Sequence, residues 1–162
     1  MNTLKTQILS AFLMSLCLLM TTAAHANERY GKQKVVYHIN YDNPKKQGGA
    51  LRNIQNHINA VGAENLDVKV VLHGHGLSLL LDPESLVKVP KFKHANADEK
   101  MIAKIDNLKG QGIDFNVCAN TVKGRKVDVD SDLHDVEKSD IVPSGVAELA
   151  RLQAMGYSYI KP

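Results

Sequence analysis

Tryptophan is absent from the 162-residue sequence, and only three phenylalanines and five tyrosines are present. The hydrophobic core must therefore be built from valine, isoleucine, leucine and alanine. An excess of one charge is also lacking, because 20 lysines and arginines stand against 17 aspartates and glutamates. The basic residues are scattered among the acidic ones and form no patch, which argues against a nucleic-acid partner.

Long apolar runs are missing after the first 26 residues. Within those 26, Lys5 is the only charge, an apolar stretch follows it, and a small-x-small Ala-His-Ala sequence ends at Ala26. The apolar stretch is too short to span a bilayer comfortably, so the pattern predicts a cleaved signal peptide over residues 1–26. No pair of arginines precedes it, which favours the general export route. We expect a mature chain that begins at Asn27 in a bacterial periplasm, with no membrane anchor; a thylakoid or extracellular location is the alternative.

Cysteine is scarce as well, with Cys17 inside the predicted signal peptide and Cys118 alone in the mature chain. Oxidising compartments favour paired cysteines, and a single cysteine cannot form an internal disulfide. Three interpretations of Cys118 remain open at this point: an inert buried thiol, an intermolecular disulfide or a reactive thiol. The sequence contains no Walker A or G-x-G-x-x-G motif, and no Ser-His-Asp order stands out. Hydrolase or dehydrogenase activity is therefore not expected, and no cofactor is predicted.

What the sequence does contain is a regular alternation of β-branched and amphipathic segments over residues 27–162, enough for one domain. Strands are predicted over residues 34–40, 67–72, 113–117, 141–143 and 157–160, and helices over 50–61, 97–108 and 146–155. The polar residues 41–49 are interpreted as a loop, and the last helix is expected to turn Val146, Leu149, Ala150 and Leu152 inward. The short connections indicate an α/β fold, a three-layer flavodoxin-like sandwich with a mostly parallel sheet.

Three loops leave the carboxyl ends of predicted strands and should meet at one edge of the sheet, where such folds place ligands and reactive groups. Cys118 directly follows the strand over residues 113–117. If Asn120 or Thr121 caps a helix there, free amides face the sulfur, and Arg125 adds a nearby cation. Helix N-termini and cations lower the pKa of a thiol and favour the thiolate. Cys118 is therefore the principal candidate for a catalytic residue.

A His73-Gly74-His75-Gly76 segment follows the strand over residues 67–72 at the same edge. On an extended chain the two histidines would face one side and offer two ligands to zinc or copper. No third ligand is evident, so no metal site is predicted, and we expect His73 to assist proton transfer at the cysteine. The residues expected to bind a ligand at this edge are Asn40, Asn43, Gly74, His75, Asn120, Thr121 and Arg125.

Four segments resemble those of DsrE/DsrF-like proteins in pattern and order: KVVYHIN, LRNIQNHINAVG, DVKVVLHGHG and GIDFNVCANTVKGR. The chain is similar to small exported members of that superfamily from about Lys34 to Pro162. The resemblance implies a three-layer α/β fold, homo-oligomers that are often trimers or hexamers, and a strand-end cysteine that accepts a persulfide and passes it to a partner. Cys118 resembles that cysteine in position. The export signal is a departure, because the relays known for this family are cytoplasmic.

The sequence therefore favours a periplasmic sulfur carrier that handles persulfide through Cys118, with a sulfur donor or acceptor protein as its partner. The polar residues after the cysteine would stabilise the anionic sulfur. One alternative is a non-enzymatic oligomeric module that binds a small ligand or a metal through His73 and His75. Another is a purely structural oligomer in which the thiol of Cys118 is buried and inert.

Overall fold

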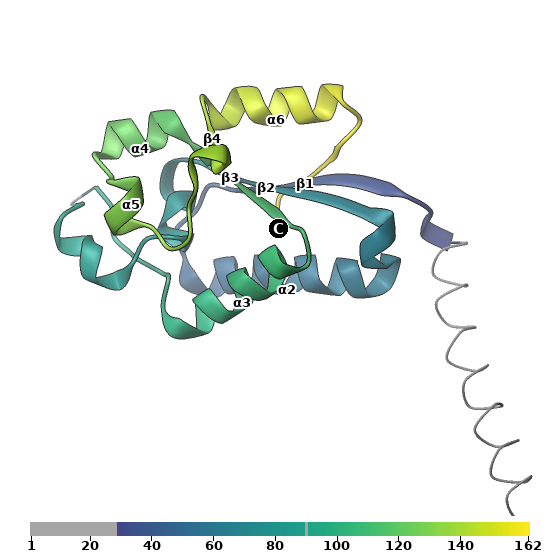
Figure 1. The fold of residues 1–162 in the computed structure, drawn as a ribbon, viewed down its shortest axis with the longest axis horizontal. Coiled ribbons are helices and arrows are strands. Elements are labelled where there is room, and N and C mark those ends of the chain that lie inside the picture. The colour runs from purple at the N-terminus through teal and green to yellow at the C-terminus, as the bar shows by residue number, and fades with distance from the viewer. Residues whose placement is uncertain (1–28, 90) are drawn as a thin grey trace, which may run out of the picture.

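A five-stranded parallel sheet, in the order β4-β3-β2-β1-β5, is the centre of the molecule (Figure 1). The computed structural model describes residues 29–89 and 91–162, so the predicted signal peptide lies outside the described residues. The strands are β1 (Gln33–Ile39), β2 (Leu66–Leu72), β3 (Asp114–Cys118), β4 (Ile141–Val142) and β5 (Ser158–Ile160). Together with the flanking helices, this sheet confirms the predicted α/β fold class.

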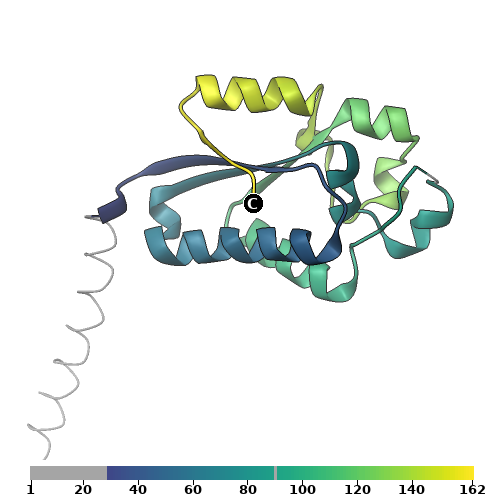
Figure 2. The ribbon, with the colours of Figure 1, turned by 180° about the vertical axis from the view of Figure 1, so that it is seen from behind.

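Helices cover both faces of the sheet, as the two opposite views show (Figures 1 and 2). On one face lie α2 (Pro44–Val61) and α3 (Glu99–Gly110), and on the other lie α4 (Ala119–Arg125) and α6 (Gly145–Ala154). Shorter segments fill the connections: α5 (Val129–Asp132), η1 (Ala63–Asn65), η2 (Gly74–Leu79), η3 (Pro83–Val87) and η4 (Lys138–Asp140). None of the helices in the described part of the chain is long and apolar enough to cross a membrane.

Side chains alternate along β1 and divide the interior into two hydrophobic clusters. Val35, Tyr37 and Ile39 belong to the larger cluster, which also contains the buried faces of α2 and α3. The smaller cluster lies under α6 and consists of Val36, Val71, Leu149, Leu152 and Tyr157. His38 is two residues beyond Val36 and continues the same side of the strand. On this side of the sheet, the hydrophobic residues of the smaller cluster are therefore followed by polar side chains toward the carboxyl ends of the strands.

The first helix starts earlier than the sequence analysis predicted. It begins at Pro44 and not at residue 50, so the pair Gly48 and Gly49 lies inside the helix and not in a loop. The Asn43 side chain accepts a hydrogen bond from the Lys46 N–H (2.9 Å), and proline suits the first helical position because its nitrogen has no hydrogen to satisfy. This capping outweighs the low helix propensity of the two glycines.

The predicted inner face of the last helix is correct for only half of its residues. Leu149 and Leu152 are buried, whereas Val146 is 64% exposed and Ala150 is also exposed. The reason lies at Gly145, which packs closely against the sheet and sets the buried row of α6 to Gly145, Leu149 and Leu152. The neighbouring row of the helix then faces the solvent.

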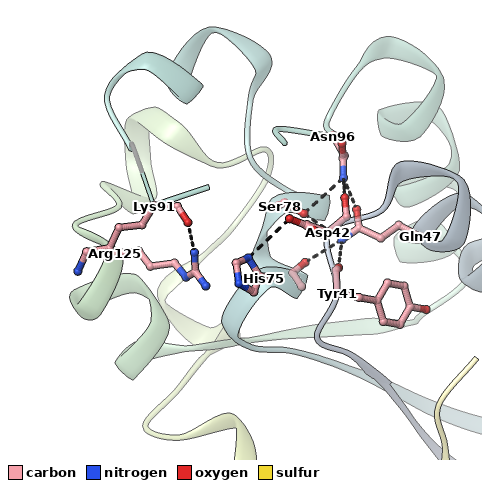
Figure 3. A network of polar contacts seen from close by, with 9 residues as sticks. Tyr41, Asp42, Gln47, His75, Ser78, Lys91, Asn96 and Arg125 are labelled. Carbon is pink, nitrogen blue, oxygen red and sulfur yellow. Dashed lines mark hydrogen bonds and ion pairs between the residues drawn. The ribbon is translucent and has the colours of Figure 1, made fainter. Parts of the chain in front are cut away.

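A buried polar network fixes three connections at the carboxyl edge (Figure 3). Gln47, in the first turns of α2, donates to the Tyr41 carbonyl (2.6 Å) and to the Ser78 hydroxyl (3.0 Å). Asn96 donates to the Asp42 carbonyl (2.8 Å) and to the side-chain oxygen of Gln47 (2.7 Å). Every buried side-chain nitrogen and oxygen in the described residues has a partner. The network is therefore satisfied, and it holds the loop after β1 against the turn after β2.

Candidate functional site

Cys118 is both the last residue of β3 and the residue that precedes the first turn of α4. Its side chain is 4% exposed, and its thiol is free. The helix begins at Ala119, so neither Asn120 nor Thr121 is its cap, contrary to the sequence-based expectation. Because the cysteine occupies the cap position itself, the free amides of the first turn lie next to the sulfur.

Four polar groups lower the pKa of Cys118. Burial raises this pKa, but the backbone N–H of Gly145 and the hydroxyl of Thr121 act against it. The backbone N–H groups of Thr121 and Asn120 add to their effect, and the resulting pKa lies below the ordinary value of a thiol. The sulfur makes no cap hydrogen bond of strict geometry, so the α4 amides act mainly as dipoles directed at it. A lowered pKa increases the thiolate population, which is the nucleophilic form.

Gly145 brings a second helix N-terminus to the sulfur. It is the first residue of α6, and the Ser144 hydroxyl caps this helix. A Cβ atom on Gly145 would lie 2.8 Å from the Cβ of His73 and 3.3 Å from the Cβ of Cys118. Only glycine therefore allows α6 to begin between these two side chains. Gly145 was not among the predicted site residues, although the Ser144-Gly145 pair before an apolar helix is a signal that the sequence contains.

Thr121 connects the cysteine to the turn after β2. Its Oγ1 atom accepts a hydrogen bond from the Gly74 N–H (2.8 Å), and its hydroxyl is directed at the sulfur of Cys118. Gly74 has a φ of +59°, a conformation that favours glycine. The side chain of Asn120 is exposed, so this residue acts at the site through its backbone N–H.

His73 is the first member of a chain of hydrogen-bonded side chains. Its Nδ1 atom lies 2.9 Å from Nε2 of His38, and Nδ1 of His38 lies 2.6 Å from the hydroxyl of Tyr159. Burial, the nearby His73 and the Lys161 ammonium lower the pKa of His38 to about 4. Burial and Lys161 also lower the pKa of His73. Both imidazoles are therefore neutral at pH 7, and His73 reaches the neighbourhood of the thiol across Gly145 without a hydrogen bond to it.

His75 does not share a side with His73, contrary to the expectation for an extended chain. The backbone after His73 enters the 3₁₀ turn η2, and Nδ1 of His75 lies 3.6 Å from the Asp42 carboxylate (Figure 3). The two histidines therefore face different partners and do not form a pair of metal ligands. In the part of the chain that the structure describes, no group of three or more His, Cys, Asp or Glu side chains has a geometry suited to a metal ion.

Three other predicted residues lie at the same edge but away from the sulfur. The Arg125 guanidinium packs 4.3 Å above the Phe92 ring and donates to the Lys91 carbonyl (Figure 3). It is not among the groups that shift the pKa of the thiol. Asn43 serves as the cap of α2. Asn40 lines a separate cavity of about 580 Å³, next to the C-terminal residues.

Comparison with known proteins identifies the family. The sequence model of the DsrE/DsrF-like family matches residues 14–162. The chain belongs to the DsrE/DsrF-like family. Among solved structures it is similar to MTH1491 from Methanobacterium thermoautotrophicum, which is described as a protein of unknown function. The two chains are 27% identical with a TM-score of 0.63, and the similarity covers 81% of this chain and 100% of the other. No curated protein matches the sequence.

This DsrE/DsrF-like protein thus combines three features at the carboxyl edge of its sheet. They are a thiol of lowered pKa, the N-termini of two helices and a pair of neutral histidines. The arrangement is suited to nucleophilic attack by sulfur with proton transfer to or from a neighbouring imidazole. Membership of the family is consistent with a role related to sulfur relay.

Proposed function

We propose that this DsrE/DsrF-like protein is an exported sulfur carrier that holds sulfane sulfur as a persulfide on Cys118. The observation that carries the proposal is a buried thiol whose pKa is nevertheless lowered, at the N-termini of α4 and α6. A core cysteine with a purely structural role needs no polar groups around its sulfur, because a neutral thiol packs as a small hydrophobic group. Here Gly145 and Thr121 direct polar hydrogens at it, which supports a reactive thiol.

The proposed loading step conserves atoms and oxidation state. Cys118 loses its thiol proton to a base, and His73 is the imidazole on the other side of Gly145. The thiolate attacks the outer sulfur of a donor persulfide, R–S–SH, so that a new S–S bond forms as the S–S bond of the donor breaks. The donor leaves as a thiolate, RS⁻, and takes up the proton. Protein thiol and R–S–SH thereby become protein persulfide and R–SH, and delivery to an acceptor thiol is the same exchange in reverse.

The same polar groups serve both sulfur species. Preorganised N–H dipoles directed at a developing negative charge stabilise it without having to reorganise. The amides of Asn120, Thr121 and Gly145 are held by helices α4 and α6, so they meet this condition for the thiolate. A persulfide on Cys118 would carry its charge one S–S bond beyond the sulfur at which these amides act. The site therefore favours an anionic sulfur before and after loading.

We further propose that the mature protein, from Asn27 onward, acts in the periplasm as a homo-oligomer of three or six copies. The signal-peptide pattern of residues 1–26 supports export, and the family resemblance supports assembly. Its sulfur donor or acceptor would then be another protein of the same compartment. A sedimentation mass equal to one chain would contradict the oligomer.

The test of the function starts from the folded mature protein. The rate of Cys118 alkylation is measured by mass at a series of pH values. The pH at which this rate is half-maximal should lie below the reference thiol pKa of about 8.5. The protein is then exposed to inorganic polysulfide, and uptake of one sulfur atom should be located on Cys118. Delivery of this sulfur to a small thiol completes the assay, with Cys118→Ser as the control. A thiol that reacts only in denaturant, or equal sulfur delivery by the serine variant, would refute the proposal.

A further inference from the structure

We propose that Tyr159, His38 and His73 form a proton relay between the thiol site and the protein surface. The inference rests on the proposed function, because it assigns the route of the proton that this reaction moves. Two short contacts in series carry it, from the Tyr159 hydroxyl to Nδ1 of His38 (2.6 Å) and from Nε2 of His38 to Nδ1 of His73 (2.9 Å). The two imidazole planes are nearly parallel, 12° apart, and their ring centroids are 4.8 Å apart.

Both ends of this chain are accessible, whereas its middle is not. Tyr159 is 43% exposed on the edge strand β5. His38 is only 6% exposed, and both of its ring nitrogens are in contact with a partner. Within residues 29–89 and 91–162, Nε2 of His73 has no hydrogen-bond partner. Since every buried side-chain nitrogen there has one, this atom reaches the surface. Its ring packs against Gly145, the same residue that packs against Cys118.

The two hydrogen bonds among Tyr159, His38 and His73 can run in either donor-to-acceptor direction while both imidazoles stay neutral. In one arrangement Tyr159 donates to His38, His38 donates to His73, and Nε2 of His73 carries a hydrogen. In the other, His73 donates to His38, His38 donates to Tyr159, and Nε2 of His73 is a free acceptor. A proton that enters at Nε2 of His73 converts the second arrangement into the first and releases a proton from the Tyr159 hydroxyl to water.

The electrostatic surroundings favour passage of a proton over its storage. Lys161 and burial oppose a positive charge on His38 and on His73, and both pKa values are lowered as a result. On this face Glu148 pairs with Arg151, Lys69 pairs with Asp67 and Asp114, and the Lys34 ammonium lies over the Tyr157 ring. Among the described residues no carboxylate is a cause of either pKa shift, so none holds an imidazolium in place. A relay that moves between two neutral arrangements avoids the charged state that Lys161 opposes.

In the loading reaction the relay acts twice. His73 accepts the proton of the Cys118 thiol at Nε2, directly or through one water, and the chain reverses as Tyr159 gives up its own proton. When the donor thiolate leaves, the reverse movement returns a proton to it from Nε2 of His73. His38 and Tyr159 do not touch the reacting sulfur atoms, so they act through His73 as positioning and relay residues.

The first experiment observes the reversal itself, without any sulfur donor. In the ¹⁵N-labelled mature protein, exchange between the two arrangements gives all four ring nitrogens of His38 and His73 chemical shifts between the values of protonated and bare nitrogens. Tyr159→Phe removes the outer partner and should move these shifts toward fixed values, whereas Tyr30→Phe, at the other end of the sheet, should leave them unchanged. A single fixed tautomer in the unaltered protein would overturn the relay.

The second experiment measures the rate of sulfur uptake from polysulfide on Cys118. Tyr159→Phe and His38→Gln should each slow it by roughly tenfold, less than the ~10²–10⁴-fold of a complete general base because His73 remains. The alkylation profile of the thiol against pH should stay unchanged, since it reports only the thiolate population. Uptake at the unaltered rate in both variants would overturn the relay while leaving the proposed function standing. If the unaltered protein takes up no sulfur, the proposed function fails, and the ring-nitrogen shifts alone decide on the relay.

Discussion

The Thr121→Val variant isolates the side chain that contributes most specifically to the state of the thiol. Thr121 is buried, with 9% of its surface exposed, and its hydroxyl makes two contacts. It directs its hydrogen at the sulfur of Cys118 and accepts a hydrogen bond from the Gly74 N–H (2.8 Å). Valine has nearly the same shape but no hydroxyl, so the variant removes both contacts while it leaves the backbone of α4 in place.

The size of the effect follows from the strength of the contact. A hydrogen bond to a charged group contributes about 1.5–3 kcal/mol, and a difference of about 1.4 kcal/mol between the two protonation states changes their ratio tenfold. The thiolate population of Cys118 at neutral pH should therefore fall by roughly ten- to a hundredfold in Thr121→Val. The loss of the acceptor for Gly74 should lower the free energy of unfolding by a further ~1 kcal/mol.

The assay is the rate of Cys118 alkylation across a range of pH, followed by mass. In Thr121→Val the profile should move to higher pH and reach a plateau at least as high, because a thiolate of higher pKa is the stronger nucleophile. Thr121→Ser is the matched control, since it keeps the hydroxyl, and it should restore the original profile. Identical profiles for the valine variant and the unaltered protein would refute the assignment of Thr121. A lower plateau at every pH would instead mean that access to the sulfur had changed.

Three further outcomes are expected. Gly145→Ala should lower the free energy of unfolding by about 1–3 kcal/mol, because its Cβ would overlap His73; an unchanged urea midpoint would contradict the close packing. Asn96→Ala should lower the free energy of unfolding by about 1–3 kcal/mol, because it removes the donor to the buried side-chain oxygen of Gln47. Urea unfolding measures this loss, and an unchanged free energy of unfolding would mean that the network does not stabilise the fold. The pKa of His38 is about 4 in the folded protein and about 6.5 when unfolded, so the unfolded state binds more protons and the free energy of unfolding should decline as the pH falls from about 6.5 to 4. His38→Gln should reduce this decline, measured as the urea midpoint against pH. An equal slope in both proteins would contradict the lowered pKa of His38.

Local patterns were sufficient to predict the fold class. The strand KVVYHI is largely apolar on both faces because β1 lies between β2 and β5 inside the sheet and helices cover both of its sides. The alternation of strands with helices implies parallel pairing. The start of α2 was missed because two glycines were given more weight than the capping pair Asn43 and Pro44. The exposed position of Val146 was missed for a different reason. A helix that starts in contact with the sheet has its buried row fixed by that contact, which the hydrophobic pattern of the helix alone does not contain.

The site residues could be predicted from the sequence only where the contacts that form the site join residues close together in the chain. Cys118 was found because a strand end is visible in the sequence. His38 and Tyr159 are 121 residues apart and meet because β1 pairs with β5, in a register that places Val36 beside Tyr159. No local signal encodes that pairing. The interpretation of His75 failed locally, since a 3₁₀ turn replaced the extended backbone that would have aligned it with its neighbour.

Burial and the helix amides act in opposite directions on the pKa of Cys118, and this opposition has a chemical consequence for the proposed role. The intrinsic nucleophilicity of a thiolate falls as its pKa falls, so the most effective attacking thiol has a pKa near the ambient pH. The amides alone would carry the pKa further down, and burial limits how far they do so. An exposed thiolate in an oxidising compartment would also meet thiols and oxidants freely. With 4% of its surface exposed, Cys118 admits only a small reactant or a partner that reaches it at the N-termini of α4 and α6. Restricted access, together with the opposing effects of burial and the amides on the pKa, favours repeated transfer of one sulfur atom over capture in a lasting disulfide.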